Sequence, residues 1–203
     1  MGYILSNIVF IETTVIRAGA QRYKFGGELY THPKFLPVEK FLSKLGSLLT
    51  GISTRYVIKE AINSFQYDLA NKIKEIPLEY KDAVLNQYIS NISQIERIIK
   101  IEELWNCRDL KKGRQVKQHY NKVRTWYFSI SSEELIISIG DPSLVKKGLE
   151  PSDRIILSEA CYLRESKELH CLLFATYDRV FIKLEPLIKS NFGIRPQIPE
   201  NID

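Results

Sequence analysis

The sequence predicts an α/β fold with a mainly parallel central sheet. Two short apolar runs, 8–11 near the start and 171–177 near the end, are rich in Val, Ile, Leu and Phe and lack polar alternation. Such runs are typical of strands buried on both faces of a parallel sheet. Each run is followed by an acidic residue, Glu12 or Asp178. Because open α/β sheets bind their ligands at the carboxyl ends of their strands, we expect both acids in one site.

Length and composition indicate a single globular unit. The chain has 203 residues, somewhat long for one domain and short for two. A hydrophobic fraction of 44% with 26% charged residues is ordinary for a protein with a sizeable core. We therefore expect one domain over 1–203, with a helical and basic insertion at about 75–130.

Local patterns indicate the first elements. A strand is expected at about 7–12, and glycines and a proline between 19 and 33 argue against a long helix after it. Apolar residues recur at helical spacing over 38–49, and Gly51 is interpreted as the stop of that helix. Residues 51–54 are interpreted as a linker.

Helices are expected in the middle of the chain. Ser53 and Thr54 can cap a helix that runs from Tyr56 to about Ala70 or Ile73, with Glu60 in its early turns. Apolar spacings of three and four then fit two or more further helices between Leu78 and Glu103.

The C-terminal third mixes clear and ambiguous signals. Residues 134–139 fit either a strand or a helix, because their periodicity does not decide. Asp141-Pro142-Ser143 is interpreted as a turn or a helix start. Ser152 and Asp153 precede periodic apolar residues and mark another helix start with an acid in its first turn. Three elements complete the chain: a strand ending at Asp178, a helix over 179–190 and an extended tail over 192–199.

A basic stretch lies between Trp105 and Trp126, with His119 and Tyr120 interleaved. It is either a surface that follows a phosphate backbone or a solvated helix face whose lysines maintain solubility. The net charge of +5 is weak support for a polyanionic partner such as RNA. The candidate RNA-binding residues are Arg108, Lys111, Lys112, Arg114, Lys117, Lys122 and Arg124.

Other functional classes find little support. Cys107, Cys161 and Cys171 show no CxxC spacing, so we expect reduced, mostly buried thiols and no zinc site. The three histidines lie far apart, and no GxxxxGK[ST] or GxGxxG motif occurs. No apolar stretch reaches the roughly 18 to 20 residues of a membrane helix, so we expect no membrane association and a cytoplasmic location.

The acidic residues follow a recognisable order along the chain. Four segments carry it: Phe10-Ile11-Glu12-Thr13-Thr14, Ser53-Thr54-Arg55-Tyr56-Val57-Ile58-Lys59-Glu60, Ser152-Asp153-Arg154-Ile155-Ile156-Leu157-Ser158-Glu159-Ala160 and Phe174-Ala175-Thr176-Tyr177-Asp178-Arg179-Val180-Phe181. The series resembles the PIN domain family, with the VapC-type toxin ribonucleases as the nearest familiar branch. The resemblance covers roughly 1–70 and 145–200, and it implies a PIN-like three-layer α/β/α fold.

The resemblance implies a carboxylate site for Mg²⁺ or Mn²⁺. The implied catalytic residues are Glu12, Glu60, Asp153 and Asp178. Of these, Glu12, Asp153 and Asp178 are the implied direct or water-mediated metal ligands, and Glu60 is expected to hold a second ion or to orient water. Thr13 and Thr176 are expected to orient carboxylates or hold waters. Glu159 is a supporting candidate, although its position six residues beyond Asp153 favours an ordinary surface or salt-bridged role.

Phosphodiester hydrolysis explains why acids are needed. The reaction must neutralise charge on the phosphate and activate a water, and hard divalent cations held by carboxylate oxygens do both. Clustered acids without a cation would repel one another and raise their pKa values. Taken singly, Glu60 is typical of a solvated helix residue, and Asp153 and Asp178 of helix caps. Glu12 is harder to explain in that way, because burying an acid without a partner is costly.

Two positions depart from the family pattern. Position 12 is Glu where the family usually has Asp, and the longer side chain matters because Mg²⁺ tolerates little deviation from octahedral geometry. Tyr177 stands where the family often has Asn or another small polar residue, which removes an expected supporting hydrogen bond.

The sequence therefore predicts a metal-dependent endoribonuclease, either toxin-like or acting in RNA processing. For a toxin-like member, the resemblance also implies a small antitoxin partner and homodimerisation. The alternative is a non-catalytic PIN-like module that binds RNA or protein and whose metal site is degenerate at Glu12.

Overall fold

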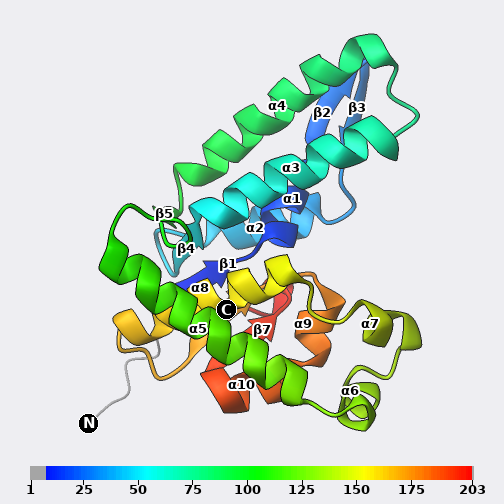
Figure 1. The fold of residues 1–203 in the computed structure, drawn as a ribbon. Helices are drawn as coiled ribbons and strands as arrows, with labels where there is room; N and C mark the ends of the chain where they lie inside the picture. Colours follow the sequence, from blue (N-terminus) through cyan, green and yellow to red (C-terminus); the bar gives the residue numbers. More distant parts are fainter. Residues whose placement is uncertain (1–7, 203) are drawn as a thin grey trace.

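The computed structural model describes residues 8–202 and has an α/β architecture, with helices flanking a five-stranded sheet (Figure 1). Every pair of neighbouring strands is parallel. In spatial order the strands are β5 (Lys100–Glu102), β4 (Thr50–Thr54), β1 (Ile8–Ile11), β6 (Leu172–Ala175) and β7 (Ile194–Gln197). The predicted α/β class and mainly parallel sheet are confirmed. Position 7 of the expected first strand lies outside the described residues.

Helices cover both sides of the sheet (Figure 1). On one side lie α1 (Thr13–Ala20), α2 (Phe35–Ser43), α3 (Arg55–Asn71) and α4 (Leu78–Glu96). On the other lie α5 (Leu110–Ser129), α8 (Pro151–Ser166), α9 (Arg179–Lys183) and α10 (Glu185–Phe192). Two short helices, α6 (Ser132–Ile139) and α7 (Pro142–Lys147), connect α5 to α8, and a 3₁₀ turn, Pro199–Asn201, follows β7.

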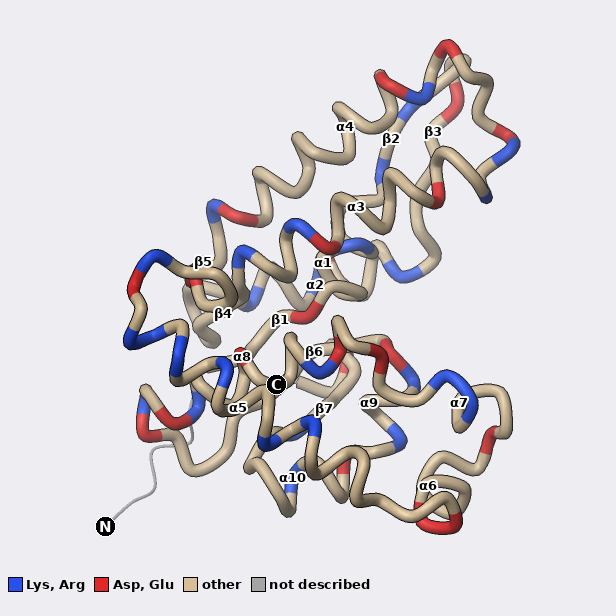
Figure 2. Tube along the Cα trace, in the orientation of Figure 1, with Lys and Arg blue, Asp and Glu red and all other residues tan. Residues whose placement is uncertain are grey.

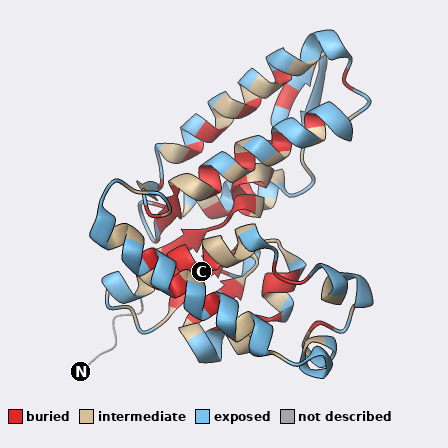
Figure 3. Ribbon diagram, viewed as in Figure 1, coloured by how far each residue is buried: buried red, intermediate tan, exposed pale blue. Residues whose placement is uncertain are grey.

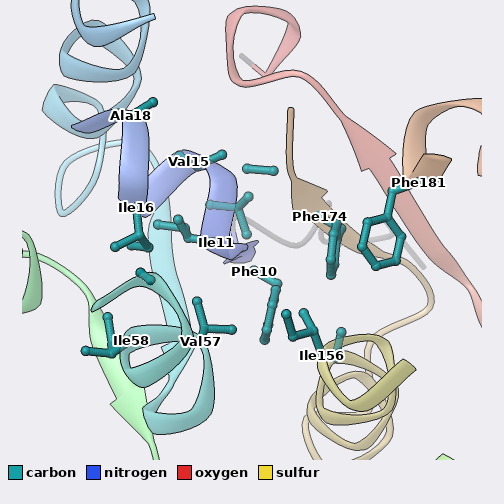
Figure 4. Packing of buried hydrophobic residues seen from close by; sticks show 14 of the residues in the cluster. Phe10, Ile11, Val15, Ile16, Ala18, Val57, Ile58, Ile156, Phe174 and Phe181 are labelled. Carbon is teal, nitrogen blue, oxygen red and sulfur yellow. The ribbon is translucent and has the colours of Figure 1, made fainter. Parts of the chain in front are cut away.

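The core forms where the two apolar strands meet. Phe10 of β1 and Phe174 of β6 are fully buried and stack with ring centroids 5.2 Å apart. Figure 4 shows Phe10 between Val57 of α3 and Ile156 of α8, with Phe174 beside Phe181. Fully burying one such side chain contributes roughly 1.5–3 kcal/mol. The three central strands, β4, β1 and β6, and the inner helix faces are mostly buried, whereas the outer faces of α4, α5 and α6 are exposed (Figure 3).

An arm built on α3 and α4 projects from the sheet (Figure 1). A hairpin of β2 (Arg22–Phe25) and β3 (Glu28–Thr31) packs against it, where the sequence indicated only a loop. Gly26 and Gly27 form the turn, both with positive φ, which glycine adopts without strain. The Asn91 amide of α4 donates to the carbonyls of Ala20 and Arg22 and so fixes the hairpin to the arm.

The expected linker at 51–54 is wrong, because these residues belong to β4. Gly51 is a point of close approach between layers and not a helix stop. A Cβ at Gly51 would lie 2.9 Å from side-chain atoms of Ile99 and Leu45 and 3.0 Å from Ile11. The preceding helix, α2, ends at Ser43, short of the expected 49.

Two further strands differ from the expected elements. Between 78 and 103 the structure has one long helix, α4, and then strand β5, which was too short to recognise. The expected tail over 192–199 contains β7, which pairs with β6. The expected insertion at about 75–130 therefore supplies an edge strand of the central sheet, together with all of α4 and α5.

Several smaller expectations are settled. Residues 134–139 are helical, as part of α6, and Asp141 caps α7. The cysteines are free as expected, but Cys161 is buried while Cys107 and Cys171 are partly exposed. Within residues 8–202, none of the helices has the length and apolar character needed to span a membrane.

Candidate active site

The strand order reverses at the centre of the sheet, next to the carboxyl ends of two strands. The chain runs from β1 outward to β4 and β5, then returns to β6 on the other side of β1 and continues to β7. The order therefore reverses between β1 and β6, and ligands of open α/β sheets bind outside the carboxyl ends of strands at such a point. Glu12 follows β1 directly, and Asp178 follows β6 by three residues. Figure 2 shows acidic segments near the middle of the molecule, between α3 and α9.

Glu12 is held at this point by hydroxyl groups. It is only 3% exposed, and its amide donates to the Ala175 carbonyl of β6 at 3.1 Å. Its oxygen Oε2 accepts hydrogen bonds from the amide of Thr14 at 2.9 Å and its hydroxyl at 2.5 Å, and from the Thr176 hydroxyl at 2.9 Å. No residue within 8–202 donates to its other oxygen, Oε1. That oxygen is therefore available to a ligand.

Asp178 caps α9 and also forms an ion pair. Its Oδ1 accepts the Val180 amide at 2.7 Å, while its Oδ2 lies 3.2 Å from the Lys147 ammonium of α7. The Asp178 amide donates to the Thr176 hydroxyl at 2.9 Å. The Thr176 hydroxyl thus connects Glu12 to Asp178. One carboxylate oxygen of Asp178 is therefore used by the helix cap, and the other faces the ammonium of Lys147.

Asp153 lies in the first turn of α8. Its Oδ2 accepts the Glu150 amide at 2.8 Å, which is the contact expected of a capping residue. In the described chain Oδ1 accepts no hydrogen bond. Burial raises the pKa of Asp153 to about 7, and the charges of Asp178 and Glu12 add to that increase. Asp153 therefore lies within electrostatic reach of both other acids.

Glu12, like Asp153, is an acid whose pKa is raised by its surroundings. Burial raises its pKa to about 7, although the hydrogen bonds from Thr14 and Thr176 act in the opposite direction, and Asp178 adds repulsion. Lys147 partly compensates this cluster. Burial alone would lower the pKa of Lys147, but Asp178, Asp153 and Glu150 raise it above its ordinary value. The site thus concentrates negative charge that a cation neutralises.

Glu60 and Glu159 lie on the α3 side of the site. Thr13 donates its hydroxyl hydrogen to Glu60 Oε2 at 2.5 Å, so Glu60 is a half-buried, oriented acid and not a solvated one. Glu159 is fully buried, which corrects the expected surface role. Its two oxygens accept the Thr54 hydroxyl and the Trp105 amide. Burial raises the pKa of Glu159 to about 7, and Glu60 adds to the increase.

Glu159 therefore acts as a structural connection. It joins α8 to the end of β4 and to the segment before α5, and both of its oxygens are already used. Six residues place it well off the Asp153 face of the helix, as the sequence indicated, but that other face points into the core and not to solvent.

The kinds of donor atom in the site suit a hard cation, but the present arrangement of the side chains does not. Carboxylate oxygens are the ligands that Mg²⁺ and Mn²⁺ prefer, and Glu12 and Asp153 each keep one oxygen without a hydrogen bond from residues 8–202. However, no three Asp, Glu, His or Cys side chains in that range converge closely enough to hold one ion. Binding would require side-chain rotation and displacement of Lys147 from Asp178.

The candidate RNA-binding residues are spread around α5 and the turn before it. Lys112 forms an ion pair with Glu102 at 3.1 Å, so its charge is partly neutralised. The other six are at least partly exposed: Arg108, Lys111, Arg114, Lys117, Lys122 and Arg124. At about 100° per residue, Lys117 and Arg124 lie on one flank of the helix, while Lys111 and Lys122 lie on the opposite one. The basic stretch is therefore solvated, and only part of it faces any single direction.

Comparisons with known proteins identify no relative: no protein-family model, curated protein or solved structure matches the chain. The chemistry of the site therefore rests on its own residues.

Three residues that contribute to the site were not identified from the sequence. Thr14 supplies two hydrogen bonds to Glu12 and also accepts the Tyr177 amide at 2.8 Å. Lys147 lies in a connecting helix that carried no catalytic signal. Tyr56 lies among the acids of α3 and α8, and its pKa is raised to about 12 by burial first and then by Glu60, Glu159 and Asp153. The second Thr after the strand-ending Glu12 was the one available signal, for Thr14.

Proposed function

We propose that this protein is a metal-dependent endoribonuclease of PIN-like type, with Glu12, Asp153 and Asp178 as its central acids. One observation carries the proposal. Three carboxylates from separate elements lie within electrostatic reach of one another at the reversal of strand order, and burial, with repulsion as a smaller contribution, raises the pKa values of Glu12 and Asp153 to about 7. A fold gains nothing from such repulsion unless a cation or proton resolves it, so the arrangement is best explained by function.

Glu12, Asp153 and Asp178 would hold Mg²⁺ or Mn²⁺. A bound ion would neutralise charge on the scissile phosphate and lower the pKa of an attacking water. The hydroxyls of Thr14 and Thr176 fix Glu12 so that Oε1 is left for the ligand. Glu60, oriented by Thr13, is placed to accept a hydrogen bond from water. Lys147, once displaced from Asp178, would be free to pair with a phosphate oxygen.

A cleavage assay on single-stranded RNA tests the proposal. The protein is incubated with Mn²⁺, Mg²⁺ or EDTA, beside Asp178→Asn and a matched Asp82→Asn, which neutralises an exposed acid on α4. We expect metal-dependent cleavage that falls by more than about 10²-fold in Asp178→Asn and is unchanged in Asp82→Asn. Thermal melting of both variants controls for folding. Full activity in Asp178→Asn, or equal activity in EDTA, would exclude this site.

The ion pair between Lys147 and Asp178 favours a second candidate function. An ammonium 3.2 Å from Asp178 Oδ2 already neutralises part of the acidic cluster without metal. The second candidate is therefore a non-catalytic PIN-like module that binds RNA or protein. Failure of Mn²⁺ to bind or to raise the melting temperature would favour this module, because a ligand selective for the folded state stabilises it. An antitoxin partner and homodimerisation stay predictions of the resemblance.

A further inference from the structure

One flank of α5 carries cations and aromatic rings in register. At about 100° per residue, Lys117, Tyr120, Arg124 and Phe128 lie within about 80° of arc around the helix. The helix is held to α8 by a different stripe, formed by Val116, His119 and Val123. No Asp or Glu occurs within Leu110–Ser129, so this flank is positively charged along its length.

Trp105 extends the flank toward the N-terminus of α5. Its ring lies 5.3 Å from that of Tyr120, centroid to centroid, tilted by 60°. Both residues are partly exposed. The Trp105 amide donates to Glu159 at 2.8 Å, and Asp109 caps α5 through the amides of Lys111 and Lys112. The two rings are therefore mounted on anchored backbone and lose little conformational entropy when a ligand packs on them.

The same flank leads to the carboxylate site. Tyr56, at the start of α3, lies within electrostatic reach of Tyr120 as well as of Glu60 and Asp153. At the C-terminal end of α5, the Arg154 guanidinium lies 5.3 Å from the Phe128 ring centroid, and Arg154 directly follows Asp153 in α8. Aromatic and cationic groups thus border the site from Trp105 to Arg154.

A surface on which aromatic rings and cations alternate suits single-stranded nucleic acid. Unpaired bases stack on aromatic side chains and on guanidinium planes, while Lys and Arg follow the phosphates between them. A duplex hides its base faces inside the stack and cannot use such rings. A protein partner would need an acidic and apolar complement, whereas apart from the rings and the exposed Leu110 at its N-terminal end this flank presents cations.

We propose that Trp105, Tyr120, Lys117 and Arg124 form a stacking platform that binds single-stranded RNA and guides it into the acidic site between β1 and β6. The identity of the strand as a substrate rests on the proposed nuclease function, whereas the binding itself does not. Arg154 at the far end continues the platform next to Asp153.

Binding is measured in EDTA, so that it is independent of cleavage. The probe is a short fluorescein-labelled oligouridylate, read by anisotropy, with an RNA duplex of equal length as competitor. The variants are Tyr120→Leu, which keeps apolar bulk, and Arg124→Gln. The matched control is Lys122→Gln, because Lys122 is exposed on the opposite flank of the same helix and, although it belongs to the predicted basic stretch, lies outside the proposed platform. Thermal melting shows whether each variant is folded.

We expect Tyr120→Leu to bind at least about 5-fold more weakly, since stacking of one base contributes that much or more. Arg124→Gln should reduce the slope of log affinity against log salt by about 0.7, the value for one phosphate contact on a single strand, and Lys122→Gln should leave it unchanged. In a Trp126→Phe background, where Trp105 is the one remaining tryptophan, the oligonucleotide should quench the fluorescence.

Three results would overturn the platform: equal losses in Arg124→Gln and Lys122→Gln, no quenching of Trp105, or competition by the duplex as effective as by the single strand. Failure of the nuclease proposal looks different. In that case these binding results hold, but no metal-dependent cleavage follows. Cleavage abolished by Asp178→Asn, together with an unquenched Trp105, would keep the nuclease and remove the platform.

Discussion

The Lys147 ammonium lies 3.2 Å from the Asp178 carboxylate oxygen Oδ2, at the position where a cation would neutralise the acidic cluster. Lys147 ends α7, and the main chain then passes through Gly148, which has a positive φ of 55°. This charge therefore enters the site from a short helix with a glycine at its end. In the proposed nuclease, Lys147 and a metal ion compete for Asp178.

Removing this charge should strengthen metal binding. We expect Lys147→Gln to bind Mn²⁺ at least about tenfold more tightly, because a unit charge near Asp178 opposes the ion by roughly 1–4 kcal/mol at surface dielectric. The control is Lys146→Gln, which removes an exposed charge from the same helix. Titration of the melting temperature with Mn²⁺ gives both affinities. Identical Mn²⁺ shifts in the two variants would mean that Lys147 does not occupy the ion position.

Asp153 should make the metal-free protein less stable as the pH rises. Its folded pKa of about 7 lies above its ordinary value, so the folded state retains a proton that the unfolded state loses earlier. The stabilising contribution is full below about pH 4 and is lost as the pH rises through about 7. Relative to Asp153→Asn, the parent should lose about 2 kcal/mol of unfolding free energy between about pH 5 and pH 8.

The comparison with Asp153→Asn is necessary because other groups titrate in this range. Burial lowers the pKa values of His32 and His119, so their contributions change with the opposite sign, and they cancel in the difference between the two proteins. Urea unfolding in EDTA at several pH values provides the measurement. A difference that stays constant with pH would show that Asp153 is not protonated in the folded state.

Local signals explain which elements the sequence could predict. β1 was visible as an apolar run, and α3 because Thr54 accepts the Val57 amide as a capping residue should. β4 was not visible, because the sequence around Gly51 is compatible with two different roles for that glycine. A glycine that stops a helix and a glycine that admits neighbouring side chains look alike until Ile99 and Leu45 are placed beside it. That contact is tertiary and has no local signature.

In the candidate site, too, some residues could be predicted from local signals and others could not. Glu12 and Asp178 were predictable because each closes an apolar strand, and parallel strands bring their carboxyl ends to one edge. Lys147 was not, because a lysine in the last turn of a helix has an ordinary explanation in the helix dipole. Its contact with Asp178 depends on how a 31-residue separation closes in space. The burial of Glu159 was not predicted, because helical periodicity shows which residues share a face of α8 but not which other elements pack against that face.

Thr176 should contribute to stability through Glu12. Thr176→Val keeps the shape of the side chain but removes the hydroxyl that donates to Glu12 and accepts the Asp178 amide. The Asp178 amide would lose its acceptor, which costs about 1–3 kcal/mol, and Glu12 would keep only the donors of Thr14, so that its pKa rises further. The exposed Thr125→Val on α5 should stay within about 0.5 kcal/mol of the parent. Equal stabilities in urea unfolding would show that this hydroxyl is not required.

Gly148 should be needed for more than its positive φ. A methyl group there would overlap the Tyr127 hydroxyl, which accepts the Leu149 amide at 3.1 Å and so secures the connection between α7 and α8. Gly140 offers a partial comparison, because its φ of 69° is also positive and nothing lies within 4 Å of the point that a Cβ would occupy. Its ψ of −6° is left-handed helical, whereas the ψ of −161° at Gly148 adds backbone strain that residues other than glycine rarely tolerate. Gly140→Ala should cost about 1–2 kcal/mol from backbone strain alone.

Gly148→Ala should cost at least about 1 kcal/mol more than Gly140→Ala, because strain and overlap add. It should also change the Mn²⁺ dependence of melting, since moving the end of α7 moves Lys147 away from Asp178. Gly140→Ala leaves that ion pair in place and should respond to Mn²⁺ as the parent does. If both variants lose the same stability and respond equally to Mn²⁺, then the Tyr127 contact does not position Lys147, and its competition with the metal has another origin.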